Sequence, residues 1–472
     1  MMLDRRAFAA AAAATASFPA PAFAAIGETF SPEAFGARGD GLTNDTHAFS
    51  ALSAEINRRG GGTIVLRAGR TYVVGAQKRG DGRFGWNPEP ILDLQDLGKA
   101  LTIIGNGARL RCQRGLRFGT FDLATGARVD RAMPNHKRAE IATPYFAMIR
   151  AENCRAPIAI RDVELDGNVA ELVIGGKFGD KFWQIPASGL LLSDNQGPER
   201  IENVYSHHHA LDGAMIPGDP TRLARSSVRR LVCRYNGRQG LSLTGGRSYD
   251  FTDCEFSRTG RSAIHSTPGA GVDIEAEHNI IRDVSFTRCR FLDNAGAGLT
   301  APVGNSEGVQ FNDCLFVGTT NYSVWPNKPR FVFTGCTFVG AIVHAYGDAD
   351  PERATRFVRC RFTDDPALSP TRQVFAGKSR AIPIVSQAGP NVMFDNSSFD
   401  LIGSATLPRT SPAVIYRDCK MSQRSSQPAG TRGRFLGTTT ISGPVVLDGS
   451  NVEGKLTVNG RQLPRGPVSN GH

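Results

Sequence analysis

Short runs of alternating hydrophobic and polar residues recur through the middle of this chain, and they contain one repeated phrase. The phrase is F-x-x-C-x-F, with clear copies at residues 251–256, 286–291, 311–316, 333–338 and 357–362. Alternation predicts strands, because a helix would place its hydrophobic residues three or four positions apart. Glycine and asparagine follow the copies, where sharp turns require them. Short strands and tight turns at a period near 22 residues predict the coils of a parallel β-helix.

The cysteines show where this repeat is regular and where it is interrupted. From Cys233 to Cys360 they follow one another at 21 to 25 residues, except for one step of 35 between Cys254 and Cys289. The odd spacing from Phe286 to Cys289 predicts a short bend that joins two strands of a coil. Because most of the nine cysteines share one repeat position, we expect a ladder of buried, reduced thiols and neither disulfides nor a metal site.

A different pattern occupies the N-terminal part of the chain. Phe35-Gly-Ala-Arg-Gly-Asp-Gly-Leu-Thr-Asn-Asp-Thr46 precedes hydrophobic residues at 49, 52 and 56, a spacing that predicts one face of a helix. Asn44 or Asp45 can cap the start of this helix, and Gly60-Gly-Gly62 ends it. We expect the helix to cover the first coil and hide a sheet edge that would otherwise pair with other strands.

Residues 30–75 resemble the N-terminal signature of the pectate-lyase-like superfamily, in the branch of rhamnogalacturonase, epimerase-like proteins and some phage tailspikes. Typical members read FGAxGDGxTDDT, then a helix, then GGxVxxPxGxY; this chain has Asn44 for an aspartate and Ala68 where proline is usual. The resemblance implies an all-β fold, a single right-handed parallel β-helix capped by the N-terminal helix. It does not specify an activity, because the superfamily includes lyases, hydrolases, epimerases and binding spikes.

Residues 1–24 have the pattern of an export signal. Asp4-Arg5-Arg6-Ala7-Phe8 resembles the twin-arginine motif, and Ala22-Phe23-Ala24 fits the small-x-small cleavage rule. The apolar run between them is too short to span a bilayer. We therefore expect a signal at 1–24, one β-helix domain at 25–460 and a flexible tail at 461–472. The protein is then periplasmic or secreted, without membrane contact after cleavage.

The formal net charge of +11 bears on partners rather than on fold. It favours an acidic polysaccharide as the substrate. We do not expect a nucleic acid as a partner, because no compact patch of basic and aromatic residues is visible. Trp183 lies in a loop with Lys177 and Lys181 and is a candidate for stacking on a sugar ring. Packing of the loop itself is the alternative role for this tryptophan.

Aligning the coils on the glycine after each turn predicts one polar outer face. The aligned segments start at Gly189, Gly213, Gly240, Gly271 and Gly298. Alternation sends hydrophobic residues such as Val272 inward and sends Asp273 and Glu275 outward, in the oversized coil between Cys254 and Cys289. His209 and Asp212 enter the same sheet from a neighbouring turn and are placed to approach Asp273.

Paired carboxylates on a sugar-binding face suit glycoside hydrolysis, in which one is a protonated acid and the other a base or nucleophile. The candidate catalytic residues are Asp273, Glu275 and Asp212, and the candidate substrate-binding residues are His209, Arg238, Arg261 and Trp183. Basic groups beside a carboxylate also suit removal of the C5 proton from a uronic acid. An ordinary solvent-facing strand and turn is the remaining alternative for these residues.

The catalytic motifs of polygalacturonases, calcium-dependent pectate lyases and alginate epimerases do not stand at matching positions, so this site rests on coil alignment alone. We expect a carbohydrate-active enzyme, with hydrolysis slightly favoured over lyase or C5-epimerase chemistry. A non-catalytic polysaccharide-binding β-helix is the second alternative. No cofactor is expected: nothing singles out a calcium site, and three adjacent histidines at 207–209 cannot all point one way to hold a metal.

Overall fold

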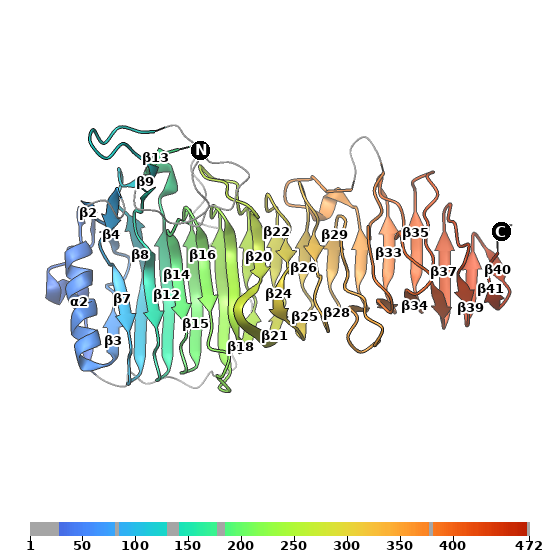
Figure 1. Cartoon of the computed structure of the whole chain (residues 1–472), viewed down its shortest axis with the longest axis horizontal. Helices are drawn as coiled ribbons and strands as arrows, with labels where there is room; N and C mark the ends of the chain where they lie inside the picture. Colours follow the sequence, from blue (N-terminus) through green and yellow to red (C-terminus); the bar gives the residue numbers. More distant parts are fainter. Residues whose placement is uncertain (1–27, 81–84, 130–140, 177–184, 377–380, 470–472) are drawn as a thin grey trace.

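The computed structural model of the chain describes residues 28–469, apart from 81–84, 130–140, 177–184 and 377–380. The expected export signal at 1–24 lies outside the described residues. The chain winds into an elongated stack of coils, with the helix α2 (Thr46–Arg59) at one end and the C-terminus at the other (Figure 1). Within the described part, no helix is long and apolar enough to cross a membrane.

The strands of successive coils form three parallel ladders, and long strands bend from the second ladder into the third. The first ladder contains β7 (Leu92–Gln95), β11 (Ala147–Glu152), β14 (Ser188–Ser193), β16 (Asp212–Pro217), the start of β18 (Gln239–Thr252), β20 (Ala270–Ile274), β23 (Leu299–Thr300) and β27 (Val324–Trp325).

The second ladder begins at β1 (Thr29–Phe30) and β3 (Gly62–Val65). It continues through β8 (Leu101–Cys112), β12 (Ile158–Asp166), β15 (Glu199–His207), β17 (Ser226–Arg234), β18, β21 (Ala276–Thr287), β25 (Val309–Asn312), β28 (Val332–Thr334), β30 (Arg356–Val358), β32 (Met393–Asp395), β34 (Ile415–Arg417), β36 (Arg434–Leu436) and β38 (Asn451–Val452).

The third ladder begins at β2 (Asp40–Asn44) and β4 (Thr71–Val74) and takes the second halves of β8, β12, β15 and β17. It then contains β19 (Glu255–Ser257), β22 (Arg290–Leu292), β26 (Leu315–Val317), β29 (Thr337–Val339), β31 (Arg361–Thr363), β33 (Ser398–Leu401), β35 (Lys420–Gln423), β37 (Thr438–Ser442) and β39 (Lys455–Val458).

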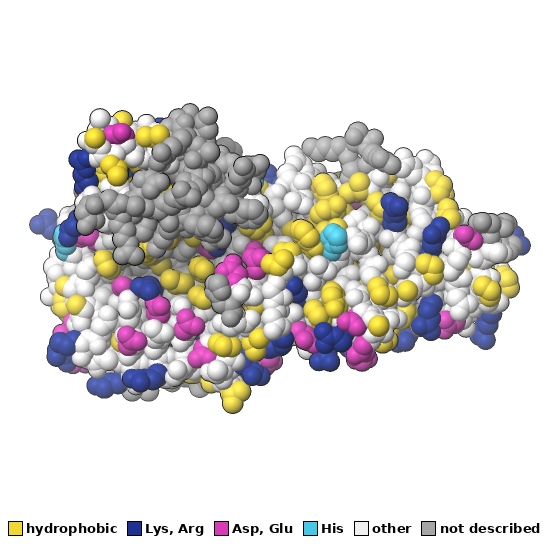
Figure 2. Space-filling view, viewed as in Figure 1, with side chains coloured by type: hydrophobic (Ala, Val, Ile, Leu, Met, Phe, Trp, Pro, Cys, Tyr) yellow, Lys and Arg dark blue, Asp and Glu magenta, His cyan; other side chains and the backbone are white. Residues whose placement is uncertain are grey.

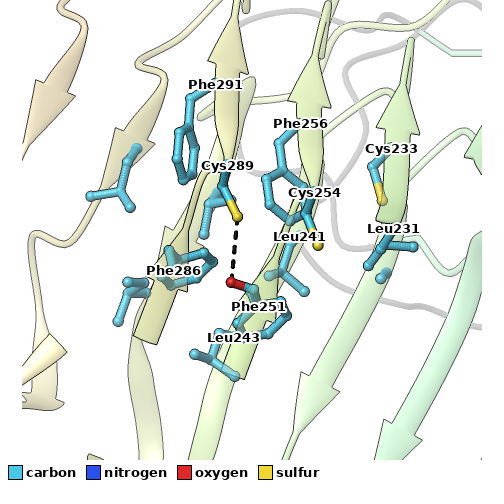
Figure 3. Packing of buried hydrophobic residues seen from close by; sticks show 14 of the residues in the cluster. Leu231, Cys233, Leu241, Leu243, Phe251, Cys254, Phe256, Phe286, Cys289 and Phe291 are labelled. Atoms are coloured by element: carbon cyan, nitrogen blue, oxygen red, sulfur yellow. Dashed lines mark hydrogen bonds between the residues drawn. The ribbon is translucent and has the colours of Figure 1, made fainter. Parts of the chain in front are cut away.

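The F-x-x-C-x-F phrase forms the corner between the second and third ladders. Arg288, just before Cys289, has φ 52°, a left-handed conformation that turns the chain and accounts for the odd spacing inside the phrase. The phenylalanines on either side point inward and stack on their counterparts in the next coil, as Phe286 does on Phe311 at 5.2 Å. Cys289 Sγ donates to the carbonyl oxygen of Phe251 in the preceding coil (Figure 3). All nine cysteines are buried and free, so the predicted ladder of thiols is confirmed.

The predicted N-terminal helix covers the edge of the first ladder. Ser53 Oγ in α2 donates to Ile91 O and accepts from Asp93 N, and Asn57 bonds the backbone of Asp93 and Gln95 in the same way. These side chains occupy the backbone groups that a further strand would use, so the edge of β7 is closed to other chains.

Residues 461–469 correct the expectation of a loose tail. They form β40 (Arg461–Leu463) and β41 (Gly466–Pro467), which pair antiparallel with β39 and β38. The physical reason is that Leu463 and Val468 are 6% and 9% exposed and complete the core of the last coil. Segments between the strands of the first coils form two small side sheets. One is β5 (Gln77–Arg79) with β6 (Trp86–Pro88); the other joins β9 (Arg117–Thr120), β10 (Ile141–Ala142) and β13 (Val173–Gly175).

Candidate functional site

The first ladder places Asp273 and Glu275 where coil alignment predicted them. Leu241 pairs with Val272 and Ser242 with Asp273, so the predicted register holds in β18 and β20. Val272 faces the core, and Asp273 lies on the opposite, outer side of β20. Figure 2 shows acidic side chains gathered over β20 on the face in view.

A buried ion pair supports Asp273 from the neighbouring coils. Arg238 binds Asp212 with two hydrogen bonds, Nε to Oδ1 at 2.9 Å and Nη2 to Oδ2 at 2.5 Å, and the two residues are 5% and 0% exposed. The next residue, Gln239, donates from Nε2 to Asp273 Oδ2 at 2.6 Å. The strand starts of β16 and β18 thereby bring one cation and one amide to the carboxyl group of Asp273.

The environment of Asp273 favours its protonated form. The residue is 4% exposed, and its burial, followed by the negative charge of Glu275, raises the pKa of Asp273 to about 8. Arg238 opposes this shift but is already engaged by Asp212. Within the described residues, Asp273 Oδ1 is buried without a hydrogen-bond partner. A neutral carboxyl group with a free oxygen is the form that can donate a proton to a substrate.

Glu275 stands two residues along the same face and is partly exposed. Burial and the charge of Glu277 raise its pKa, whereas Arg238 and Lys328 lower it. Lys328 was not found by sequence reasoning. It is 8% exposed, its Nζ donates to Gly304 O at 2.8 Å, and burial lowers the pKa of its amine while Glu275 raises it.

An aromatic pair continues the row of Asp273 toward the C-terminus. Asp273 pairs with Thr300, and Thr300 pairs with Trp325 in the next coil. The ring of Trp325 stacks on His344 with 5.3 Å between centroids and 25° between planes. The alignment of the coils on their glycines ended at Gly298; one further coil, through Ser323-Val-Trp325, would have placed Trp325 in this row.

The structure corrects the predicted position of His209 and confirms that of Asp212. His209 is fully buried inside the coil, where Nδ1 contacts Tyr145 Oη at 2.9 Å and Nε2 contacts Leu165 O at 3.1 Å. Burial lowers its pKa well below the usual value, so this ring is a neutral part of the core and not a substrate ligand. Asp212 does lie beside Asp273, but Arg238 occupies both of its oxygens, so it anchors a cation instead of standing free as an acid.

One further predicted residue does not join this cluster. Arg261 binds Thr319 and Thr320 and lies 3.3 Å from Asp293 Oδ1, contacts that tie neighbouring turns together. No hydrogen bond or ion pair in the described part of the chain links it to Asp273. Trp183 lies outside the described residues.

Three similarities to known proteins bear on the fold. Residues 179–348 match the family model "Right handed beta helix region". The A-module of Azotobacter vinelandii mannuronan C-5 epimerase AlgE4 superposes with a TM-score of 0.54 at 14% identity, over 89% of this chain and 98% of that one. The N-terminal fragment of bacteriophage Phi29 gene product 12 gives 0.54 at 15% identity, over 93% and 73%. The chain is a right-handed parallel β-helix, so the predicted fold class and the resemblance on which its handedness rests are confirmed.

One curated relative is similar in sequence. Depolymerase 1 of Klebsiella phage KN3-1, described as specific for the KN3 capsule, is 24% identical over 66% of this chain. The chain spans 39% of the length of that relative.

Proposed function

We propose that this chain is an enzyme that cleaves or modifies an acidic polysaccharide, with Asp273 and Glu275 as its reacting carboxyl groups. The observation that carries the proposal is the buried Asp273, whose pKa is raised to about 8 and whose Oδ1 has no partner among the described residues. Two carboxyl groups whose environments differ are the usual basis of acid and base roles in one site.

Hydrolysis is the reaction that we favour. Asp273, protonated at neutral pH, donates its proton to the glycosidic oxygen as the bond breaks. Glu275, which is more exposed and lies near Lys328, acts in its ionised form as the base for water or as the nucleophile. Residues two apart on a strand have Cα atoms roughly 6.6 Å apart, which leaves room for a sugar ring or a water between their carboxyl groups.

Lyase or C5-epimerase chemistry on uronates is the second candidate, and Lys328 is the observation that favours it. Burial lowers the pKa of this amine, which brings it closer to the range of a general base. A neutral Asp273 can then hydrogen-bond the sugar carboxylate while Lys328 removes the C5 proton.

An anionic polymer fits the charges and the surface around the site. The chain carries a formal charge of +11, and Arg238 and Lys328 lie beside the acidic pair. The stacked rings of Trp325 and His344 offer an apolar face to a sugar two and three coils beyond Asp273. The twin-arginine pattern at 1–24 agrees with a polymer outside the cytoplasm, and the capsule depolymerase relative agrees with a polysaccharide.

The test incubates the purified chain with a panel of polyuronates and acidic exopolysaccharides. New reducing ends without ultraviolet absorbance identify a hydrolase, unsaturated ends identify a lyase, and altered uronate composition in an uncut polymer identifies an epimerase. Binding without turnover supports the non-catalytic alternative and overturns the enzyme proposal. Asp273→Asn is the active-site variant, and Asp400→Asn is the control, because Asp400 is a half-exposed aspartate on the third ladder.

A further inference from the structure

A second cluster of side chains lies at the corner where β15 ends, on the outside of the third ladder. Asp166 at the end of β12 pairs with His207 at the end of β15, so these residues are neighbours on adjacent coils. His208 follows with φ 55°, which places its ring beside that of His207, whereas His209 turns into the core. Three consecutive histidines cannot all face one way, but two of them contact an aspartate from the preceding coil.

The potential ligand atoms converge. His207 Nδ1 lies 2.6 Å from His208 Nδ1 and 3.7 Å from Asp166 Oδ1, and one ligand atom from each residue lies within 4.8 Å of the others. Ligand atoms in a tetrahedral zinc site are roughly 3.3 Å apart, given metal–nitrogen distances of about 2.05 Å. The two distances from His207 Nδ1, one shorter and one longer than this value, mean that small ring rotations would place an ion between the three ligand atoms.

Neighbouring side chains hold the two histidine rings in the way that is usual for metal-binding histidines. His207 Nε2 contacts Glu164 Oε1 at 3.0 Å, and Arg109 holds that glutamate at 2.8 Å. A proton on Nε2 leaves the lone pair of Nδ1 directed at His208 and Asp166, the arrangement in which an outer carboxylate fixes the tautomer of a metal-binding histidine. Stacking on Tyr205 at 4.2 Å and on Tyr235 at 5.0 Å holds the rings of His207 and His208 in place.

We propose that Asp166, His207 and His208 bind one divalent transition-metal ion of the zinc or nickel class, with water completing its coordination. Two imidazole nitrogens and one carboxylate oxygen suit these ions, whereas calcium prefers oxygen ligands alone. The ion joins β12 to β15 and anchors the turn that leads into β16, at whose start Asp212 binds Arg238. This site is separate from the acidic cluster and does not depend on the proposed activity.

The experiment measures Zn²⁺ and Ni²⁺ binding to the full chain, purified without a histidine tag, by calorimetry and by metal analysis after gel filtration. The visible absorption of bound Co²⁺ distinguishes four- or five-coordinate ions in a protein site from the six-coordinate aqua ion. The variants are His207→Gln, His208→Gln and Glu164→Gln. The matched control is His47→Gln on α2, where the side chain is 85% exposed and lies 3.6 Å from a single glutamate.

We expect the wild type to bind one ion per chain. His208→Gln and His207→Gln should lose this binding, and His47→Gln should keep it. Glu164→Gln should weaken affinity by about tenfold or more, because it removes only the orienting carboxylate. Thermal melts establish that each variant folds; if the buried His207 variant does not, the partly exposed His208 variant carries the test. Absence of micromolar binding by the wild type, or binding that survives His208→Gln unchanged, overturns the site.

Discussion

Replacing Asp273 with asparagine should stabilise the chain as the pH rises, even though it removes the proposed catalytic acid. The introduced amide has nearly the same shape as the protonated carboxyl group but does not titrate. In the wild type, burial and the charge of Glu275 raise the pKa from 3.8 to about 8, so ionisation at this position is unfavourable. A catalytic group held in such an environment costs stability at the pH at which it must ionise.

The sign and size of the effect follow from proton linkage. Between pH 3.8 and about 8 the folded chain keeps a proton on Asp273 that the unfolded chain has released. The stability contributed by this group is therefore fully present below pH 3.8 and is lost as the pH rises toward 8, at about 1.4 kcal/mol per pH unit. The variant does not share this loss. The free energy of unfolding of the variant should exceed that of the wild type by about zero at pH 4 and by an amount that grows to a ceiling of roughly 6 kcal/mol just above pH 8.

The assay compares denaturant midpoints of the wild type, Asp273→Asn and Asp400→Asn across pH 4 to 9. Hydrogen exchange of the amides in β20 reports the same effect locally, because coils of a solenoid can open in part. Asp400→Asn should follow the wild type at every pH. The raised pKa of Asp273, and the catalytic role that rests on it, would be refuted by either of two results. The free energies of unfolding of the wild type and Asp273→Asn could change in parallel with pH, or their difference could become smaller as the pH rises.

Three further perturbations test other parts of the structure. Arg238→Ala should destabilise the chain by about 3–5 kcal/mol in denaturant titrations, because it leaves Asp212 buried and unpaired; an Arg238→Met, Asp212→Leu double variant should recover much of this loss. Glu277→Gln should move the acidic limb of the pH–rate profile to lower pH, since the Glu277 charge helps to raise the pKa of Glu275; an unmoved limb would mean that another group sets it. Phe311→Ala should cost about 3–5 kcal/mol in thermal or chemical unfolding, and a loss below about 1 kcal/mol would contradict the importance of the ring stack.

The regular part of the fold could be predicted from the sequence because each coil repeats the same pattern of inward-facing residues. The paired phenylalanines and the cysteine of F-x-x-C-x-F must face inward in every copy, and the register of Val272 and Leu241 follows from the glycine that precedes each of them. The left-handed corner was visible only as odd spacing, because residues as different as Arg288 and Gly335 adopt it. The end of the stack was misjudged because residues 461–469 have little hydrophobic content and gain order only by covering the last coil.

The candidate site was predicted in part. Alternation placed Asp273 and Glu275 correctly on the outer face, because a strand has a strict period of two. The predicted approach of His209 to Asp273 was wrong, because the left-handed His208 turns the chain and sends the next ring inward. Side-chain contacts between coils could not be predicted either. Nothing in the spacing of the sequence indicates that Arg238 binds Asp212 or that Lys328 lies beside Glu275.

The most direct test of the central claim is the initial rate of product formation by the wild type and by Asp273→Asn on the acidic polysaccharide that the wild type turns over. We expect the variant to lose at least about 100-fold in rate, the usual contribution of a positioned proton donor, while it remains folded and Asp400→Asn keeps full activity. Turnover by Asp273→Asn at the wild-type rate would contradict the assignment of this carboxyl group as the catalytic acid.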